Sequence, residues 1–435
     1  MTVSRTRGTL VGLAGLAALL VVGAVVHFDG REPATFYISP TGSDDNAGTS
    51  AAAPWRSLPR VGTADLRPGD RILLRGGARF AATELTVPRS AAGTRANPIV
   101  VGSYGTGRGS ITGSSGSCIT IAGSWVTVRD VVTQDCTYSG LSITGDHVTV
   151  TDIETSGSFA GVTIRDGADH AVVRDSYIHD NKTMRPNTPG PDDDSGAFGV
   201  LVNGDHALVT GNTISGQDAP SADYGTDGAA VELYGAKGTV VSYNIARDNH
   251  TFTELGGIPG VEESRDSTYA YNQVTSRQLD SKFVVLHAGG RWGRASATRL
   301  IHNTAILSGP GSEGFVCGPE CGTDALIMEA NLISASYQSG SVSGTYTQSH
   351  NILAGAAPKC VVAHVTEPCP DTFVTDPRVD GSGDYVTLRT GSPAIDSGGS
   401  DSGYSVDIAG QQVPVDGSGV GHGRADAGAW EHPAP

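Results

Sequence analysis

Two glutamates in the middle of the chain are the residues best suited to acid–base chemistry. Glu232 stands between Val231 and Leu233, in a segment that otherwise has the alternating pattern of a packed strand. We expect Glu262 to lie beside it on the next strand, about 5 Å away. Two carboxylates so close raise the pKa of one of them, which makes an acid paired with a base or nucleophile. The alternatives are a solvated strand face and a pair of calcium ligands.

Further polar residues that could take part in catalysis or binding lie near this pair in the sequence. Asp227 and Glu254 could add carboxylates, and Lys282 stands out because lysine is rare, occurring only at positions 182, 237, 282 and 359. The candidate substrate-binding residues are Arg165, Tyr234, Arg247, His250, His287 and Arg291. For each of these loop residues the alternative is a structural or merely solvated role.

A repeated strand pattern must position these residues. Short alternating apolar segments end in Asn or Asp at nine positions: Asp130, Asp152, Asp175, Asn212, Asn244, Asn272, Asn303, Asn331 and Asn351. A unit of about 22 residues with three short strands can wind once around a core and stack on its predecessor, as one coil of a parallel β-helix. We expect the repeated Asn to adopt the left-handed backbone conformation and to bond its counterparts in adjacent coils. An all-β sandwich is the alternative, but it does not predict Asn at a fixed strand offset.

Composition agrees with a turn-rich β protein. The 435 residues include 60 Gly, which excludes an ordinary helical protein because glycine destabilises helices. The net charge of −16 makes nucleic acid an improbable partner. No motif of serine hydrolases with a nucleophile elbow, zincins or nucleotide-binding enzymes occurs.

Segments near both ends carry a family resemblance. Residues 36–50 and 66–74 are similar to an N-terminal capping segment, and residues 391–398 and 426–431 to a closing segment, of the secreted pectate-lyase-like superfamily. The resemblance implies an all-β fold, a right-handed parallel β-helix of roughly ten coils with a cap at each end. We therefore expect an N-terminal cap with the first coils over 31–115, the β-helix with loop insertions over 116–356, and a C-terminal cap over 357–435. In this superfamily a lyase typically uses a Lys or Arg base, often with Ca²⁺, whereas a hydrolase needs two carboxylates.

Insertions lengthen several coils, nearly all at one expected corner. They cover residues 182–195, 217–227, 249–259, 280–282, 291–295 and 310–313. Stacked insertions build a wall beside one face and thereby a cleft. Along the bordering strands we expect an outward column of Ser142, Thr163, Leu201, Glu232 and then Glu262, with Arg165, Tyr234 and His287 two positions further on. The acidic run Asp192–Asp194 is a candidate Ca²⁺ ligand set, with an ordinary soluble loop as the alternative.

The N-terminus and the cysteines both indicate export. Arg5 and Arg7 precede an apolar run over residues 8–26, which is typical of a signal peptide or an uncleaved anchor within residues 1–30. The six cysteines form neighbouring pairs that suit disulfides in an oxidising compartment. We expect the pairs Cys118–Cys136, Cys317–Cys321 and Cys360–Cys369. A zinc site is the alternative, although no spacing supports it.

Together these features predict a secreted or surface-anchored protein that cleaves a polysaccharide in a groove along the β-helix. The carboxylate pair and the acidic surface favour hydrolysis over elimination. The alternative is a non-catalytic, glycan-binding or cell-wall-associated β-solenoid. We expect a monomer that binds no nucleic acid, meets the membrane only through its N-terminal segment and needs no cofactor, with Ca²⁺ as the alternative.

Overall fold

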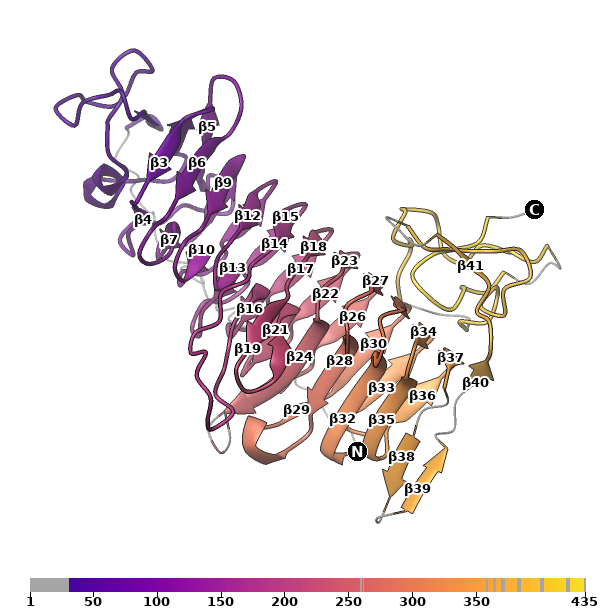
Figure 1. Cartoon of the computed structure of the whole chain (residues 1–435). Coiled ribbons are helices and arrows are strands. Elements are labelled where there is room, and N and C mark those ends of the chain that lie inside the picture. Colours follow the sequence, from indigo (N-terminus) through magenta and orange to yellow (C-terminus); the bar gives the residue numbers. More distant parts are fainter. Residues whose placement is uncertain are drawn as a thin grey trace, which may run out of the picture. The chain divides into compact units, whose positions relative to one another are not determined.

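Three long parallel sheets make up most of the chain (Figure 1). The computed structural model describes residues 31–435, apart from residues 259, 261, 357–358, 363–364, 369–371, 382–384, 400–402, 420–422 and 434–435. The chain divides into two compact units, residues 1–32 and 33–435, and the fold described below is that of the second unit. Each coil supplies one strand to each sheet in turn, which is the predicted right-handed parallel β-helix.

The sheets are numbered in the order in which each coil visits them. Sheets 1 and 2 have 12 strands each, from β1 (Thr35–Ile38) to β36 (Thr347–Ser349) and from β3 (Arg79–Ala81) to β40 (Thr372–Val374). Sheet 3 has 14 strands. Its central members are β7 (Ile119–Ile121), β10 (Ser139–Ile143), β13 (Ala160–Ile164), β16 (Phe198–Val202), β21 (Ala229–Tyr234), β24 (Thr251–Ile258), β28 (Lys282–His287), β32 (Glu313–Cys321) and β35 (Gln338–Gly344). Alternate residues of these strands, such as Val231 and Leu233, fill a continuous apolar core.

An asparagine ladder runs along the corner between sheets 1 and 2, as the sequence predicts. The ladder consists of Asn212, Asn244, Asn272, Asn303, Asn331 and Asn351, and Nδ2 of each of the first five donates to Oδ1 of the next. The Asn272 backbone N–H and Nδ2 both donate to Oδ1 of Asn303, at 3.1 and 2.9 Å. Stacked amides thus satisfy one another inside the solenoid.

Two details of this prediction are wrong. The strand register pairs Arg174 with Thr210, so Asp175 aligns with Gly211 and not with Asn212. Asp130 and Asp152 lie in the same column as Asp175, one residue before the ladder. It is this preceding residue that adopts the left-handed conformation, for example with a φ of 50° at Asp175 and 66° at Gly211.

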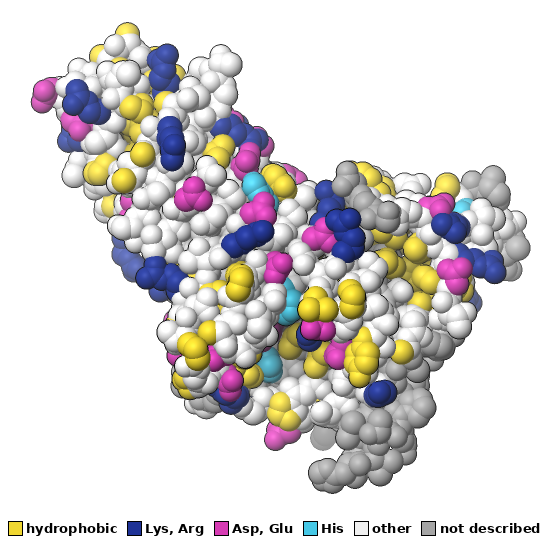
Figure 2. All heavy atoms as spheres, viewed as in Figure 1, with side chains coloured by type: hydrophobic (Ala, Val, Ile, Leu, Met, Phe, Trp, Pro, Cys, Tyr) yellow, Lys and Arg dark blue, Asp and Glu magenta, His cyan; other side chains and the backbone are white. Residues whose placement is uncertain are grey.

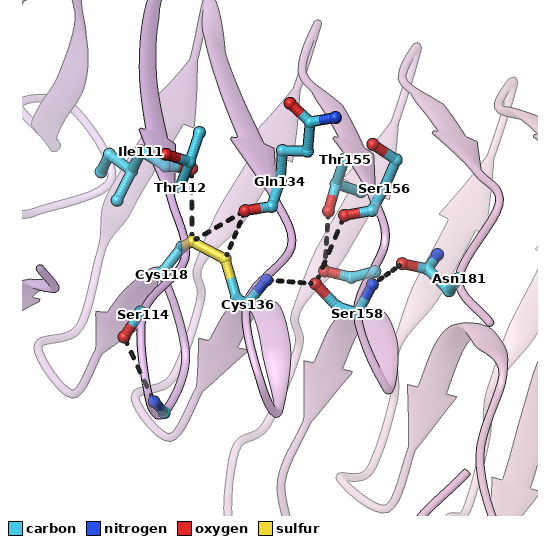
Figure 3. Close-up of a disulfide and its surroundings, with 12 residues drawn as sticks. Ile111, Thr112, Ser114, Cys118, Gln134, Cys136, Thr155, Ser156, Ser158 and Asn181 are labelled. Atoms are coloured by element: carbon cyan, nitrogen blue, oxygen red, sulfur yellow. Dashed lines mark hydrogen bonds between the residues drawn. A yellow bond between two sulfur atoms is a disulfide. The ribbon is translucent and has the colours of Figure 1, made fainter. Parts of the chain in front are cut away.

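A second polar ladder follows the corner between sheets 2 and 3 (Figure 3). The Cys136 N–H donates to Ser158 Oγ at 3.2 Å, and the Ser158 N–H donates to Asn181 Oδ1 at 3.1 Å. The ladder continues through Gln217 and Asn249. The predicted disulfide between Cys118 and Cys136 joins two successive coils at its start.

The second predicted disulfide, Cys317–Cys321, also forms, with the two Cα atoms 5.7 Å apart. The third expected pair includes Cys369, which lies outside the described residues, so that pairing stays a prediction. The expected export segment, residues 1–30, lies outside them as well. In the part of the chain that the structure describes, no helix is long and apolar enough to cross a membrane.

The C-terminal segment folds back along the flank of the coils (Figure 1). Trp430 Nε1 donates to Gln273 Oε1 at 2.9 Å, and the Ala429 N–H donates to Thr304 Oγ1 at 2.9 Å. The Tyr271 ring contacts Tyr404 at a centroid distance of 5.3 Å. This segment therefore covers the asparagine-ladder corner of the later coils.

Candidate active site

A cleft of about 1090 Å³ lies over the outer face of sheet 3. Figure 2 shows the hollow over the middle of the stack, where acidic, histidine and apolar side chains meet. Its lining includes Asp193, Asp194, Asp227, Glu232, Glu254, Asp280 and Glu313 with His250, Lys282, His287 and Arg291. Acids outnumber bases in this lining, so the cleft is an acidic one.

Loops at both edges of sheet 3 form the walls. On one edge lie the loop of residues 182–195 and the hairpin of β19 (Ala219–Ser221) and β20 (Gly225–Asp227). On the other edge lies the short 3-10 helix η2 (Gly290–Trp292), directly after β28. Two expected insertions differ from this arrangement: residues 249–259 are largely strand β24 itself, and residues 291–295 lie at the opposite corner.

The outward column of sheet 3 matches the prediction up to Glu232. Ser142 pairs with Thr163, Thr163 with Leu201, and Leu201 with Glu232. The next residue is Glu254, however, because β21 and β24 are in register with Glu232 opposite Glu254. The expected position of Glu262 in this column is therefore wrong.

Glu262 lies outside the column because β24 continues into a hairpin. β24 pairs antiparallel with β25 (Glu262–Arg265), which carries Glu262 opposite Ile258. The Glu262 Oε1 atom lies 3.6 Å from Lys237 Nζ. Its carboxylate thus forms a salt bridge, and it is absent from the lining of the cleft.

Glu232 is a buried carboxyl of the cleft, with 7% of the residue exposed. Burial raises its pKa well above the ordinary value, and the charges of Glu254 and Asp227 raise it further. Among the described residues, none forms a hydrogen bond with the Glu232 carboxyl. Burial and Glu254 likewise raise the pKa of Asp227 to about 7. At neutral pH the cluster therefore retains a proton to donate.

Two neighbours hold the carboxylate of Glu254. The Tyr234 hydroxyl donates to Glu254 Oε1 at 3.2 Å, and His287 Nε2 lies 2.8 Å from the same oxygen. Gly256 of β24 lies in the same column as Tyr234 of β21 and His287 of β28, between the two. A Cβ at Gly256 would lie 2.6 Å from the Tyr234 ring, so only glycine leaves room for this arrangement.

Two bases lie on the opposite side of the acids. Lys282 Nζ donates to the Asp280 carbonyl at 2.9 Å. Burial and the charge of Lys282 lower the pKa of His250 to about 4, so its imidazole is neutral at pH 7. The expected cleft positions of Lys282 and His250 are thus observed.

Arg291 connects the two walls across the cleft. Its guanidinium forms an ion pair with Asp192 and donates to the Pro191 carbonyl at 2.6 Å. The same guanidinium lies 4.5 Å from the centre of the Trp292 ring. This link therefore crosses the outer face of sheet 3, from the loops at its edge next to sheet 2 to η2 at the opposite edge.

The acidic loop is tied down by hydrogen bonds. Asp194 accepts the Ser221 hydroxyl at 2.6 Å and the Asp223 N–H at 2.9 Å. Asp223 in turn accepts the N–H groups of Gly190 and Asp193. Ligand oxygens of Asp193, Asp194 and Asp223 lie within 4.8 Å of one another, which is close enough for a hard cation such as Ca²⁺.

Two expected binding residues lie outside the cleft lining. Arg165 donates to the Tyr138 hydroxyl at 2.6 Å and so only borders its N-terminal end. Arg247 belongs to β23 (Ile245–Arg247), a strand of sheet 2.

The sequence prediction missed an aromatic platform beside the acids. Tyr138 stacks on Phe159 at 5.1 Å, and Phe159 meets Phe198 edge-on at 5.4 Å. With Leu201 these side chains line the cleft one to three coils before Glu232. The sequence does hold a signal for this platform, because an aromatic residue stands at the start of, or directly before, three successive strands of sheet 3.

The family assignment rests on the solenoid itself. The model described as "Right handed beta helix region" matches residues 117–347, slightly more than half of the chain. This chain belongs to the right-handed β-helix family. The matched part of this β-helix protein contains the cleft acids and all of the asparagine ladder except Asn351.

Known proteins similar to this β-helix protein include lacto-N-biosidases and a pectate lyase. A lacto-N-biosidase of Bifidobacterium longum subsp. longum is 43% identical over 74 residues, which amounts to 16% of this chain and 5% of that protein. The crystal structure of pectate lyase Pel9A aligns with a TM-score of 0.61 and 15% identity, over 93% of this chain and 98% of that one. The GH136 lacto-N-biosidase from Eubacterium ramulus gives a TM-score of 0.51 and 15% identity, over 79% and 67%. At these identities the structures establish the shared fold.

Proposed function

We propose that this protein is a glycoside hydrolase acting in the cleft over sheet 3. The observation that carries the proposal is the cluster of Asp227, Glu232 and Glu254, in which burial and mutual repulsion raise two pKa values. Glycosidases pair a protonated carboxylic acid with a carboxylate across the scissile bond. The local similarity to a lacto-N-biosidase supports the same class of reaction.

In the proposed reaction Glu232 donates its proton to the glycosidic oxygen. Glu254 acts from the next strand as the nucleophilic carboxylate, held by Tyr234 and His287. Adjacent strands lie about 4.8 Å apart, and retaining glycosidases hold their two carboxyls about 5–5.5 Å apart. The register of Glu232 opposite Glu254 therefore favours retention of the anomeric configuration.

The lining suits a neutral saccharide. Tyr138, Phe159 and Phe198 offer apolar ring faces to the apolar face of a sugar. The surplus of carboxylates over Lys282 and Arg291 repels a polyuronate, whose elimination would require positive charge at the substrate carboxylate. β-Elimination with Lys282 as the base is the second candidate, because Lys282 does line the cleft.

A substrate panel separates these functions. Neutral oligosaccharides, including a p-nitrophenyl lacto-N-bioside, and polyuronates should be assayed both for reducing ends and for ultraviolet absorbance of unsaturated uronates. We expect reducing ends without absorbance, and retention when the first product is examined by NMR. Absorbance from polyuronates would establish elimination instead. Binding of glycans with no cleavage across the panel would favour the non-catalytic β-solenoid.

Action outside the cytoplasm is part of the proposal. The disulfides Cys118–Cys136 and Cys317–Cys321 support an oxidising compartment, which agrees with the export segment expected in residues 1–30. Detection of the mature chain in the culture medium or at the cell surface would test it.

A further inference from the structure

Two histidines and an aspartate cluster away from the cleft, at the corner between sheets 3 and 1. Asp169 and His170 lie between β13 and β14 (Val172–Arg174), and His206 lies one coil further on, before β17 (Leu208–Thr210). The Nδ1 atoms of His170 and His206 lie 2.9 and 2.8 Å from the same oxygen, Oδ1 of Asp169. About half of each side chain is exposed, so an ion in solution can reach the cluster.

The solenoid holds these side chains in place before any ligand arrives. His170 and His206 take left-handed backbone conformations, with φ of 56° and 53°. Their backbone N–H groups donate to carbonyls of the next coil, those of Asp205 and Lys237. The two imidazole rings stack with their centroids 4.9 Å apart.

Conformation alone does not require histidine at these corners. Asn and Asp adopt the left-handed region as readily, and other corners of this chain use Asp, Gly or Ala. Histidine adds an aromatic ring, which stacks along this corner with His147 and the other histidine, and an imidazole nitrogen. Here two such nitrogens from successive coils face one carboxylate, with the three candidate ligand atoms within 4.8 Å of one another.

We propose that Asp169, His170 and His206 bind one divalent transition-metal ion of the Zn²⁺ class. Imidazole nitrogen and carboxylate oxygen are ordinary Zn²⁺ ligands at about 2.0–2.2 Å, and three protein ligands leave a position for water. Ca²⁺ and Mg²⁺ prefer oxygen ligands and are excluded by the two imidazoles. The ion joins two successive coils and therefore stabilises their stacking.

Calorimetric titration of the full-length, EDTA-treated and dialysed protein with ZnCl₂ tests this site. We expect one Zn²⁺ per chain at this cluster and a higher melting temperature in its presence. His206→Asn and Asp169→Asn should each weaken binding at least tenfold and abolish the thermal shift. Asn is chosen at position 206 because it tolerates the left-handed conformation.

His350→Asn is the matched control, since His350 is also exposed and left-handed, with a φ of 58°. It should bind Zn²⁺ like the wild type. A large excess of Ca²⁺ should not displace the Zn²⁺, and Co²⁺ should show the intense visible absorption of a low-coordinate nitrogen and oxygen site. Unchanged Zn²⁺ binding in both His206→Asn and Asp169→Asn, no binding to the wild type, or displacement by Ca²⁺ would overturn the proposal.

Discussion

The asparagine ladder and the cleft acids are two sets of buried polar groups in the same solenoid, and they are treated in opposite ways. Asn303 donates through Nδ2 to the Tyr269 carbonyl and to Asn331 Oδ1, both at 2.9 Å, and its Oδ1 accepts two bonds from Asn272. Glu232 is buried to a similar degree, yet it faces the like charges of Glu254 and Asp227. The buried amides of the asparagine ladder are neutral and bond one another, whereas Glu232 is buried beside other carboxyls, which favours its protonated form.

The largest expected effect comes from Glu232→Gln. Loss of the proton donor should lower kcat/KM about 10³-fold or more, about 4 kcal/mol in activation free energy. Gln is neutral in both states, so folding no longer requires a buried carboxyl to take up a proton at neutral pH, and the melting temperature should rise. Hydrolysis assays and thermal denaturation measure the two effects.

Glu262→Gln is the matched control, because this glutamate lies near the cleft in sequence but pairs with Lys237. It should change activity little. Full activity in Glu232→Gln, or a loss as large in Glu262→Gln, would break the distinction between the two carboxyls.

Asn303→Ala should have the reverse effect. The substitution leaves the Tyr269 carbonyl and the Asn272 donors without partners, which costs about 2–3 kcal/mol of unfolding free energy. Urea denaturation measures this loss. The specific activity of the folded fraction should be unchanged, and a normal denaturation midpoint would show that the ladder is not a source of stability.

Part of the pH dependence of stability should come from the cleft, and none from the ladder amides, which do not titrate. In the C-terminal segment burial likewise raises the pKa of Asp426 to about 6 and that of Glu431 to about 7. The pKa of Asp227 rises from 3.8 to about 7 on folding, so between these values the folded state binds more protons than the unfolded state. Its contribution is present below pH 3.8 and is lost as the pH rises through about 7, with a slope of about 1.4 kcal/mol per pH unit. Urea midpoints at pH 5 and 7.5 should show the decline, and Asp227→Asn should make it less steep, while Glu232, Asp426 and Glu431 still contribute. An equal slope in that variant would assign the effect elsewhere.

The smallest expected effect is that of Tyr234→Phe. It removes one hydrogen bond to Glu254 while the ring stays in place, so kcat/KM should fall about fivefold, near 1 kcal/mol. Tyr224→Phe serves as the control, because Tyr224 is an exposed residue of the same cleft. If both variants lose the same activity, the bond to Glu254 has no specific role.

The sequence predicts the fold well because a solenoid repeats its signal. The asparagine ladder is readable since one side chain recurs at one offset from the core residues. The three aspartates at 130, 152 and 175 are misplaced by one residue, because Asp suits the left-handed corner next to the ladder as well as the ladder itself.

The site is harder to predict because its register depends on a local break in the pattern. The Gly256–Gly257 pair suggests a loop, although it lies inside β24. One signal was present: the Glu-Leu pair at 232–233 recurs at 254–255, after 22 residues, which is one short coil. The signal for the aromatic platform is weak, because Tyr138 and Phe159 share one register position but Phe198 lies one residue further on, opposite Ala160.

The C-terminal segment that covers the ladder corner imposes an order on assembly. The chain is made from its N-terminus, so the coils that carry Tyr243, Tyr271 and His302 exist before residues 374–433 do. Until that segment arrives, these aromatic side chains have only water above them, whereas the earlier coils present Asp130, Asp152 and Asp175 at the same column. The first coils thus present charged groups to water at this corner, whereas the later coils expose an aromatic surface until the C-terminal segment covers it. Such an exposed surface favours aggregation during folding.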